Sequence, residues 1–401
     1  MKLNRKIKAY ITIGKTFGVW VSPIITGIFL FVMRTFVSIG LLMDKLFFKM
    51  ARKPSLQSPI VIVGNPRSGT TFLQRYLIQS NLGCGAQLWQ LLYPSIVLQK
   101  LIKPLLPLLE KISPARHHST AAHKTSLTSV ETDDVGLFFR YFDGFFLYGF
   151  LLSFADEDLF EYFDPRVRNT SKRDFDWFES VWTRTIANQN VPYIGKLFSL
   201  STNLPAFQKR FPDAKILYMV RDPLKVIPSG LSLVTGVLDK KFGFWSLSQS
   251  KRDQYIARLY RALVELLRRF HEDWTNESIN RSMVLIVRYD QMMSNFDQLM
   301  DSILDFIDQQ PSGKRKSLYL KDDDYRLSFL YGSYLTLTNL SEQDWLRIDQ
   351  QRLTPLFVSV HATEPSLRSK LLRNPKAIDL LNQLAWFSKK RIQKKFYSKT
   401  C

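Results

Sequence analysis

A loop near residue 65 combines glycine, arginine and threonine in a pattern that suits phosphate or sulfate binding. Residues 60–63 are β-branched and predict a short buried strand. Gly64 and Gly69 then stand five residues apart, which is the glycine spacing of a phosphate-binding loop. Thr70 and Thr71 open a predicted helix. The backbone N–H groups of such a loop, at the positive end of a helix, form an anion site.

The cation of this loop is Arg67. Loops that bind nucleoside triphosphates have a lysine after the second glycine, where this chain has Thr70. Arginine can instead bind two oxygens of a phosphate or sulfate at once. The alternative, a glycine turn without a ligand, is disfavoured because strand, loop, cation and helix follow in the required order.

A second candidate phosphate site follows the predicted strand at residues 216–220. Arg221 ends this strand, Asp222 can cap the next helix and Pro223 suits its first turn. Ser229 lies eight residues after Arg221, two turns into that helix. An arginine at the end of a strand and a serine on the following helix can bind one phosphate together. The alternative is a salt-bridged Arg221 and a surface serine.

Residues 66–71, Pro-Arg-Ser-Gly-Thr-Thr, resemble the loop that binds 5′-phosphosulfate in sulfotransferases that use 3′-phosphoadenosine 5′-phosphosulfate (PAPS). The resemblance is greatest to bacterial sulfotransferases and tyrosylprotein sulfotransferases, and it covers roughly residues 58–310. Residues 221–223 and Ser229 resemble the 3′-phosphate site of the family. The resemblance implies PAPS as co-substrate, without a metal, bound by Arg67, Ser68, Gly69, Thr70, Thr71, Arg221 and Ser229.

Sulfuryl transfer requires a base for the acceptor hydroxyl and a cation for the departing bridging oxygen. Arg67 is the expected cation. In bacterial members of this branch a histidine precedes an acidic cluster by eight residues, and the spacing from His123 to Glu131 agrees. We expect Glu131 to be the base and keep His123 as the second candidate. The alternative for Glu131 is a charge that stabilises a helix N-terminus.

Lys196 ends a predicted strand at residues 193–196 and either assists the bridging oxygen or is solvated at the surface. Related enzymes often have an acidic residue near a tryptophan after the loop helix, and in tyrosylprotein sulfotransferases a glutamate there is the proposed base. This chain has Gln87-Leu-Trp89-Gln90 instead. Because glutamine cannot accept the proton, we expect no base from that segment.

The order of predicted elements indicates an α/β fold, namely a P-loop-containing three-layer sandwich with a central parallel sheet flanked by helices. Predicted strands at 60–63, 193–196, 216–220 and 283–287 alternate with helices near 70–80, 137–152, 175–188, 223–235 and 253–274. We expect residues 55–401 to form one sulfotransferase domain and residues 1–54 a separate apolar, membrane-associated segment.

The chain has 56 Lys and Arg against 35 Asp and Glu, a net charge of +21. No nucleic-acid-binding motif accompanies this charge, so it favours a membrane surface over nucleic acid. Residues 16–33 carry no charge over eighteen positions, about the lower limit for crossing a bilayer. Pro23 and Gly27 within this stretch equally suit a kinked, re-entrant or interfacial segment. A helix packed on the catalytic domain is the third alternative.

The two cysteines predict no disulfide framework and favour a reducing compartment. We expect the catalytic domain on the cytoplasmic face of a bacterial membrane, or in the Golgi lumen if the source is eukaryotic. The acceptor is expected to be a hydroxyl, or else an amine, on an organic molecule that is apolar, lipid-linked or a glycan. Aromatic residues such as Phe138 and Phe145 either line its pocket or belong to the core. The oligomeric state is left open.

Two other functions are compatible with the loop. One is a P-loop kinase or triphosphatase, which would need Mg²⁺ and for which Asp222 and Asp290 are the available ligands. The other is a relative that binds phosphonucleotides without catalysis. The absence of the loop lysine opposes the first. The presence of Arg67, Arg221 and Ser229 opposes the second.

Overall fold

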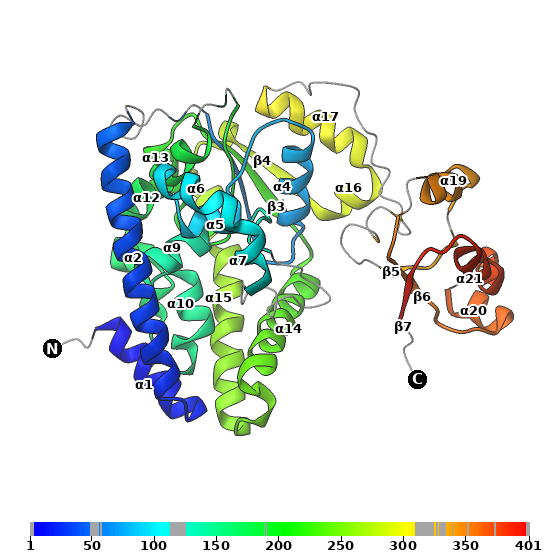
Figure 1. The fold of residues 1–401 in the computed structure, drawn as a ribbon, viewed down its shortest axis with the longest axis horizontal. Coiled ribbons are helices and arrows are strands. Elements are labelled where there is room, and N and C mark those ends of the chain that lie inside the picture. The colour runs from blue at the N-terminus through cyan, green and yellow to red at the C-terminus, as the bar shows by residue number, and fades with distance from the viewer. Residues whose placement is uncertain are drawn as a thin grey trace. The chain divides into compact units, whose positions relative to one another are not determined.

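The computed structural model describes residues 4–48, 56, 58–112, 126–187, 189, 191–308, 325, 328, 334–338, 340–350, 353–372 and 374–397. The chain forms two compact units, shown in Figure 1. Unit 1 comprises residues 1–113, 126–289 and 301–315, and unit 2 comprises 114–125, 290–300 and 316–401. The first helices belong to unit 1, and residues 316–401 belong to unit 2. The boundary at residue 54 stays a prediction.

A four-stranded parallel sheet forms the centre of unit 1. Its strands are β1 (Ile60–Gly64), β2 (Ile194–Leu197), β3 (Lys215–Val220) and β4 (Val284–Arg288), in the order β2-β1-β3-β4. Ile60 pairs with Ile194 on one side and with Lys215 on the other. The predicted strands are confirmed. Because the strands are parallel and β1 is central, the loops after β1, β2 and β3 open at one edge of the sheet.

Helices flank this sheet, and the predicted fold class is confirmed (Figure 1). The predicted helix at 137–152 is two helices, because Phe142 and Gly144 adopt φ angles of 52° and 80°. The helices that bear on the site are α4 (Thr70–Gln79), α5 (Leu88–Leu92), α6 (Ile96–Ile102), α7 (Leu106–Ile112), α9 (Asp134–Tyr141), α10 (Phe145–Phe150), α12 (Ser171–Thr185), α13 (Leu204–Arg210), α14 (Pro223–Phe242) and α15 (Gln249–Thr275).

Two apolar clusters hold these layers together. The first joins alternate sheet residues such as Val61 and Tyr218 to Trp182 of α12 and Phe207 of α13. The second joins α10, α14 and α15, and its buried members include Phe145, Leu147, Tyr148, Val226, Ile227, Tyr255, Leu259 and Leu263. Phe145 therefore belongs to the core, and Phe138 packs against the same cluster. Of the two roles considered for these aromatic residues, the structure supports packing.

The first two helices are α1 (Arg5–Phe17) and α2 (Val21–Phe47). The uncharged stretch at 16–33 is therefore not one helix, since Gly18 ends α1 in the left-handed conformation with φ of 69°. Pro23 falls in the first turn of α2, where a proline is tolerated. The predicted N-terminal apolar helix is thus present, but it begins later and continues to Phe47.

Unit 2 contains a three-stranded parallel sheet of β5 (Tyr334–Leu335), β6 (Leu356–Ser359) and β7 (Lys394–Tyr397), in that order. Its helices are α19 (Glu342–Gln350), α20 (Pro365–Leu372) and α21 (Leu380–Lys389). Ile348, Leu356 and Phe387 are among its buried core residues. Arg368 is buried and donates hydrogen bonds to the carbonyl oxygens of Thr336, Val360 and Ala377. Helices α16 (Tyr289–Ser294) and α17 (Phe296–Ile307) lie between β4 and this sheet in the sequence.

Candidate active site

The loop after β1 is a tight turn that only particular residues can form. Gly64, Arg67 and Gly69 have φ angles of 145°, 77° and 94°. A side chain at Gly64 would place its Cβ 2.7 Å from the carbonyl oxygen of Met219, so glycine is required there. Ser68 Oγ donates to the Asn65 carbonyl oxygen at 2.7 Å. The chain thus holds a non-glycine residue, Arg67, in the left-handed region directly before the α4 N-terminus.

The two predicted anion sites are joined through Arg67. Its Nε donates to Ser229 Oγ on α14 at 3.1 Å. Arg221, at the end of β3, donates from Nη1 to the Arg67 carbonyl oxygen at 2.7 Å. The Arg221 guanidinium also lies 4.3 Å from the centre of the Tyr289 ring. Ser229 was predicted to act with Arg221, whereas in the structure its hydroxyl accepts a hydrogen bond from Arg67.

This arrangement concentrates positive charge at the edge of the sheet. Burial lowers the pKa of Arg67, and the nearby charge of Arg221 lowers it further. The positive charge of Arg221 thus disfavours the charged form of Arg67. A bound phosphate or sulfate would offset that repulsion and could accept hydrogen bonds from both groups. The residues present therefore fit a dianionic ligand.

Lys196 is buried at the end of β2, with 1% of its surface exposed. The alternative of a solvated surface lysine is therefore wrong. Its Nζ donates to Thr71 Oγ1 at 3.0 Å, at the start of α4. Burial lowers the pKa of Lys196, and the negative charge of Glu131 opposes that effect. The ammonium group thus lies against the start of α4, next to the loop after β1, and within electrostatic reach of the candidate base.

Glu131 is 6% exposed and accepts a hydrogen bond from Ser129 Oγ at 3.1 Å. Its backbone N–H donates to the Ala86 carbonyl oxygen at 3.4 Å. Helix α9 begins at Asp134, so the acidic residue in its first turn is Asp134 rather than Glu131. His123, the second candidate base, lies outside the described residues.

Asp133 and Asp134, which were not among the predicted site residues, accept hydrogen bonds from groups at the end of β2. Asp133 accepts hydrogen bonds from Tyr193 Oη at 2.5 Å, Trp182 Nε1 at 2.9 Å and the Lys196 N–H at 2.9 Å. Burial raises the pKa of Asp133 to about 6, although these hydrogen bonds lower it in part. Asp134 accepts from the Phe198 N–H at 2.7 Å and from the Ser199 hydroxyl. In the sequence, the acidic run that continues directly after Glu131 indicates both residues.

The segment that contains Gln87 and Trp89 has a structural role at the N-terminus of α5 (Leu88–Leu92). Gln87 Oε1 accepts from Trp89 Nε1 at 2.7 Å, and the Gln87 N–H donates to Gln90 Oε1 at 2.9 Å. The hydrogen bond between Gln87 and Gln90 is part of the capping box of α5. The Leu88 and Trp89 N–H groups then donate to the carbonyl oxygens of Ser129 and Leu127. This segment therefore supports the stretch that carries Glu131.

Across the described residues, no group of three His, Cys, Asp or Glu side chains is placed to hold a metal ion. The described part of the chain also contains one helix, Val21–Phe47, that is long and apolar enough to cross a membrane. Length and composition alone do not show that it does so.

The fold and this site agree with a comparison against protein-family models. The model of the sulfotransferase family matches residues 59–310, which is more than half of the chain. The chain belongs to the sulfotransferase family.

Two solved structures share the fold. Sulfotransferase STF1 from Mycobacterium tuberculosis H37Rv is 15% identical, with a TM-score of 0.56 over 76% of this chain and 81% of the other. Sulfotransferase STF9 from Mycobacterium avium is 17% identical, with a TM-score of 0.51 over 68% of this chain and 69% of the other. At this identity the likeness is one of fold. A comparison with curated proteins gives no significant match.

A second family model, described as a radical SAM-like domain, matches residues 287–397. This range covers less than half of the chain and lies mostly in unit 2. Iron–sulfur clusters are held by cysteine thiolates, and residues 287–397 contain no cysteine. We therefore assign no radical chemistry to this segment.

Proposed function

We propose that this protein transfers the sulfuryl group of PAPS to a hydroxyl, or alternatively an amine, of an organic acceptor. The observation that carries the proposal is the pairing of Arg67 with Ser229, together with the Arg221 hydrogen bond to the Arg67 carbonyl oxygen. The hydrogen bond from Arg221 to the Arg67 carbonyl oxygen links two cationic residues that follow different strands and are 154 residues apart in sequence. PAPS carries anionic groups at both its 5′ and 3′ positions and requires two such sites.

The residues of the two anion sites have different proposed roles. The loop N–H groups, Arg67 and Thr71 bind the 5′-phosphosulfate, and Arg221 binds the 3′-phosphate. Ser229 accepts a hydrogen bond from Arg67 Nε and so positions the Arg67 side chain. Ser68 contributes mainly by closing the loop through its bond to Asn65.

In the reaction, a bond forms between the acceptor oxygen and sulfur while the bond from sulfur to the bridging phosphate oxygen breaks. The acceptor proton passes to Glu131, and the negative charge passes to the phosphate of the departing 3′-phosphoadenosine 5′-phosphate. Lys196 stabilises that charge, since its ammonium group lies against Thr71 at the loop. If Glu131 is not the base, His123 takes its place.

We also propose that the acceptor is apolar or lipid-linked and that the protein is membrane-associated, with unit 1 on the cytoplasmic face. The segment that leads to Glu131 is tied to α7, because the Leu127 N–H donates to Glu110 Oε2 at 2.9 Å. Helix α7 and the turn before it expose Leu105 and Leu108. An acceptor approaching along this apolar side reaches the candidate base from the surface of unit 1.

The donor is tested by calorimetry with 3′-phosphoadenosine 5′-phosphate in the presence of a chelator. We expect binding without Mg²⁺ and much weaker binding of ATP, which lacks the 3′-phosphate. Tight, Mg²⁺-dependent ATP binding with no binding of the PAPS product would overturn the proposal in favour of a kinase or triphosphatase. The acceptor is then sought by incubating membranes that contain the protein with radiolabelled PAPS and separating the products.

A further inference from the structure

Helix α2 has two faces of different character. Leu30, Met33, Val37, Gly40 and Asp44 are buried and recur every three to four residues, so they form one stripe along the helix. The opposite side is apolar and exposed, with Phe29, Phe31 and Phe36 exposed to 61%, 68% and 61%. The exposed large apolar residues of this outer face are Val21, Ile24, Ile25, Ile28, Phe29, Phe31, Val32, Phe36, Ile39, Leu42, Met43, Leu46 and Phe47.

Polar contacts bind the buried stripe to unit 1. Asp44 Oδ2 accepts from Arg184 Nε of α12 at 2.8 Å, and both side chains are almost fully buried. Asp44 also accepts from Ser95 Oγ and from two backbone N–H groups at the start of α6. Farther along, Arg34 Nε donates to the Phe139 carbonyl oxygen at 2.7 Å. The Arg34 side chain therefore points inward rather than to the outer face.

These contacts are incompatible with a helix surrounded by lipid. The stretch from Leu30 to Asp44 spans about 21 Å of helix axis, most of the roughly 30 Å of a bilayer core. Lipid on the inner side would have to replace both the Asp44–Arg184 ion pair and the packing of Gly40, where an added Cβ would lie 2.7 Å from Leu98. An unpaired charge in hydrocarbon is strongly unfavourable.

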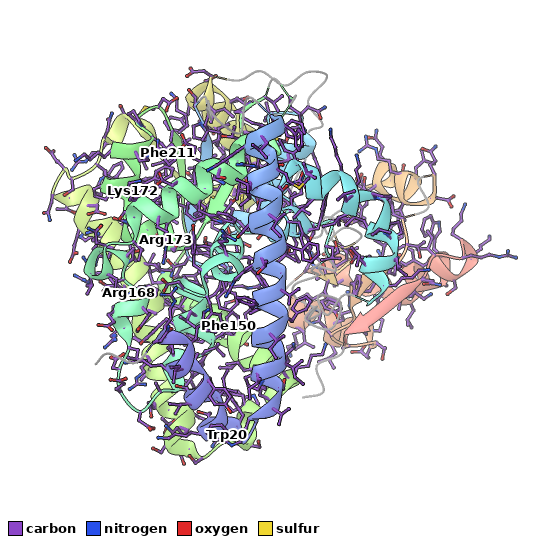
Figure 2. The ribbon with its side chains drawn as sticks, turned by 60° about the vertical axis from the view of Figure 1, so that its left-hand side comes forward. Trp20, Phe150, Arg168, Lys172, Arg173 and Phe211 are labelled. Atoms are coloured by element: carbon purple, nitrogen blue, oxygen red, sulfur yellow. The ribbon has the colours of Figure 1, made fainter. Side chains whose placement is uncertain are left out.

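We propose that α2 does not cross the membrane but lies flat on it, with its outer face inserted into one leaflet of an anionic bilayer. Figure 2 shows α2 along its length, with Trp20 at one end. Trp20 is 45% exposed, and tryptophan is typical of the membrane interface. The face continues onto α6, η1 (Lys103–Leu105) and α7, where Leu101, Leu105 and Leu108 are exposed.

The charges beside this face select an anionic membrane over a second protein copy. Lys45, Lys100, Lys103 and Lys111 are exposed on α2, α6, η1 and α7. The acidic residues of the same elements point inward, since Asp44 binds Arg184 and Glu110 binds the Leu127 N–H. An aliphatic and aromatic helix face bordered by lysines matches acyl chains bordered by anionic headgroups. Two copies would instead bring these lysines together.

This inference deepens the membrane association proposed above and is independent of the sulfotransferase assignment. Orientation is tested on the full chain with Cys84→Ser and Cys401→Ser, carrying one spin-labelled cysteine at a time at Ile25, Phe29, Phe36 or Ile39. The protein is bound to phosphatidylglycerol vesicles and the depth of each label is measured by collision with oxygen and a nickel complex. We expect similar depths within one leaflet, and a label at Lys172 on α12 should stay in water. Depths that differ by most of a bilayer between Ile25 and Ile39 would overturn the proposal in favour of a span.

Binding is tested by flotation with vesicles of phosphatidylglycerol or phosphatidylcholine. Phe29→Asp with Phe36→Asp should reduce vesicle binding at least tenfold, and Lys100→Glu with Lys103→Glu should remove the preference for phosphatidylglycerol. The matched control is Lys172→Glu with Lys209→Glu, which reverses two exposed charges on α12 and α13 and should change little. Circular dichroism and urea denaturation of each variant show that unit 1 is folded. Equal vesicle binding by the Phe variant and the control overturns the membrane face, whatever the donor.

Discussion

Two sets of charged residues near the edge of the unit 1 sheet differ in their hydrogen-bond partners. Asp133 and Asp134 accept hydrogen bonds from tyrosine, tryptophan, serine and backbone donors that surround them. Burial disfavours the charged forms of these two carboxylates and also those of Arg67 and Lys196, and at Arg67 the positive charge of Arg221 adds to that effect. The first set stabilises the end of β2. The second set is held in an electrostatic state that an anionic ligand would relieve.

Glu131 lies two residues from Asp133 in the sequence but belongs to neither set. Its side chain accepts from Ser129 and acts on the charge of Lys196. Burial is nearly equal for Glu131 and Asp133, at 6% and 1% exposed. Asp133 accepts from three donors at the end of β2, whereas Glu131 acts on the charge of Lys196, and we therefore propose different roles for the two carboxylates. The following predictions test this distinction.

The largest effect is expected from Asp133→Ala. The variant leaves Tyr193 Oη, Trp182 Nε1 and the Lys196 N–H without their acceptor in a buried site. Each such donor costs about 1–3 kcal/mol, so the free energy of unfolding should fall by at least about 3 kcal/mol. Urea denaturation followed by tryptophan fluorescence measures it. Glu131→Gln is the matched control and should change stability by less than about 1 kcal/mol; equal losses in both variants would remove the distinction.

Glu131→Gln should reduce turnover roughly a hundredfold or more, which is the usual contribution of a general base. Calorimetry should show unchanged binding of 3′-phosphoadenosine 5′-phosphate, because Glu131 lies outside the two anion sites. Transfer of radiolabelled sulfate to the acceptor measures turnover. If Glu131→Gln is fully active while His123→Ala is not, the base is His123.

Arg221→Ala should weaken binding of 3′-phosphoadenosine 5′-phosphate by about 1.5–3 kcal/mol, through loss of a charge-assisted phosphate contact. It also removes the donor to the Arg67 carbonyl oxygen, so part of the loss comes through the first loop. Calorimetry of the variant provides the value. Lys225→Ala, on the exposed first turn of α14, is the control of equal charge. A loss of the same size in that control would show a general electrostatic effect instead of a bound phosphate.

The smallest effect concerns pH. Because burial lowers the pKa of Lys196, its ammonium group should deprotonate below the usual range for lysine. If the cation is needed, activity falls as pH rises through that lowered pKa. Lys196→Arg retains a cation at all these pH values, so its profile should lack the alkaline decline even though its maximal rate is reduced. An unchanged alkaline limb in Lys196→Arg would assign the decline to another group.

Much of the site was predictable because it depends on local sequence. The β-branched residues at 60–63 and the glycine spacing specify a strand, a loop and a helix, and Asp222 caps α14 as expected, accepting from the Leu224 N–H at 3.0 Å. Parallel strands with ligands at their carboxyl ends then follow from the alternation of elements. The division into units was not predictable from composition, since no glycine-rich or proline-rich linker marks it.

The sequence alone determined the four strands of the central sheet, the two cationic loops and the presence of a long apolar segment. Only the tertiary structure decided that Ser229 meets Arg67, that Asp133 and Asp134 fix the end of β2, and that Lys196 is buried. It also decided that α2 binds unit 1 through Asp44 and Arg184. The physical reason is the same in each case: these contacts join residues 49 to 162 positions apart, and their partners are set by strand order and helix packing rather than by local spacing.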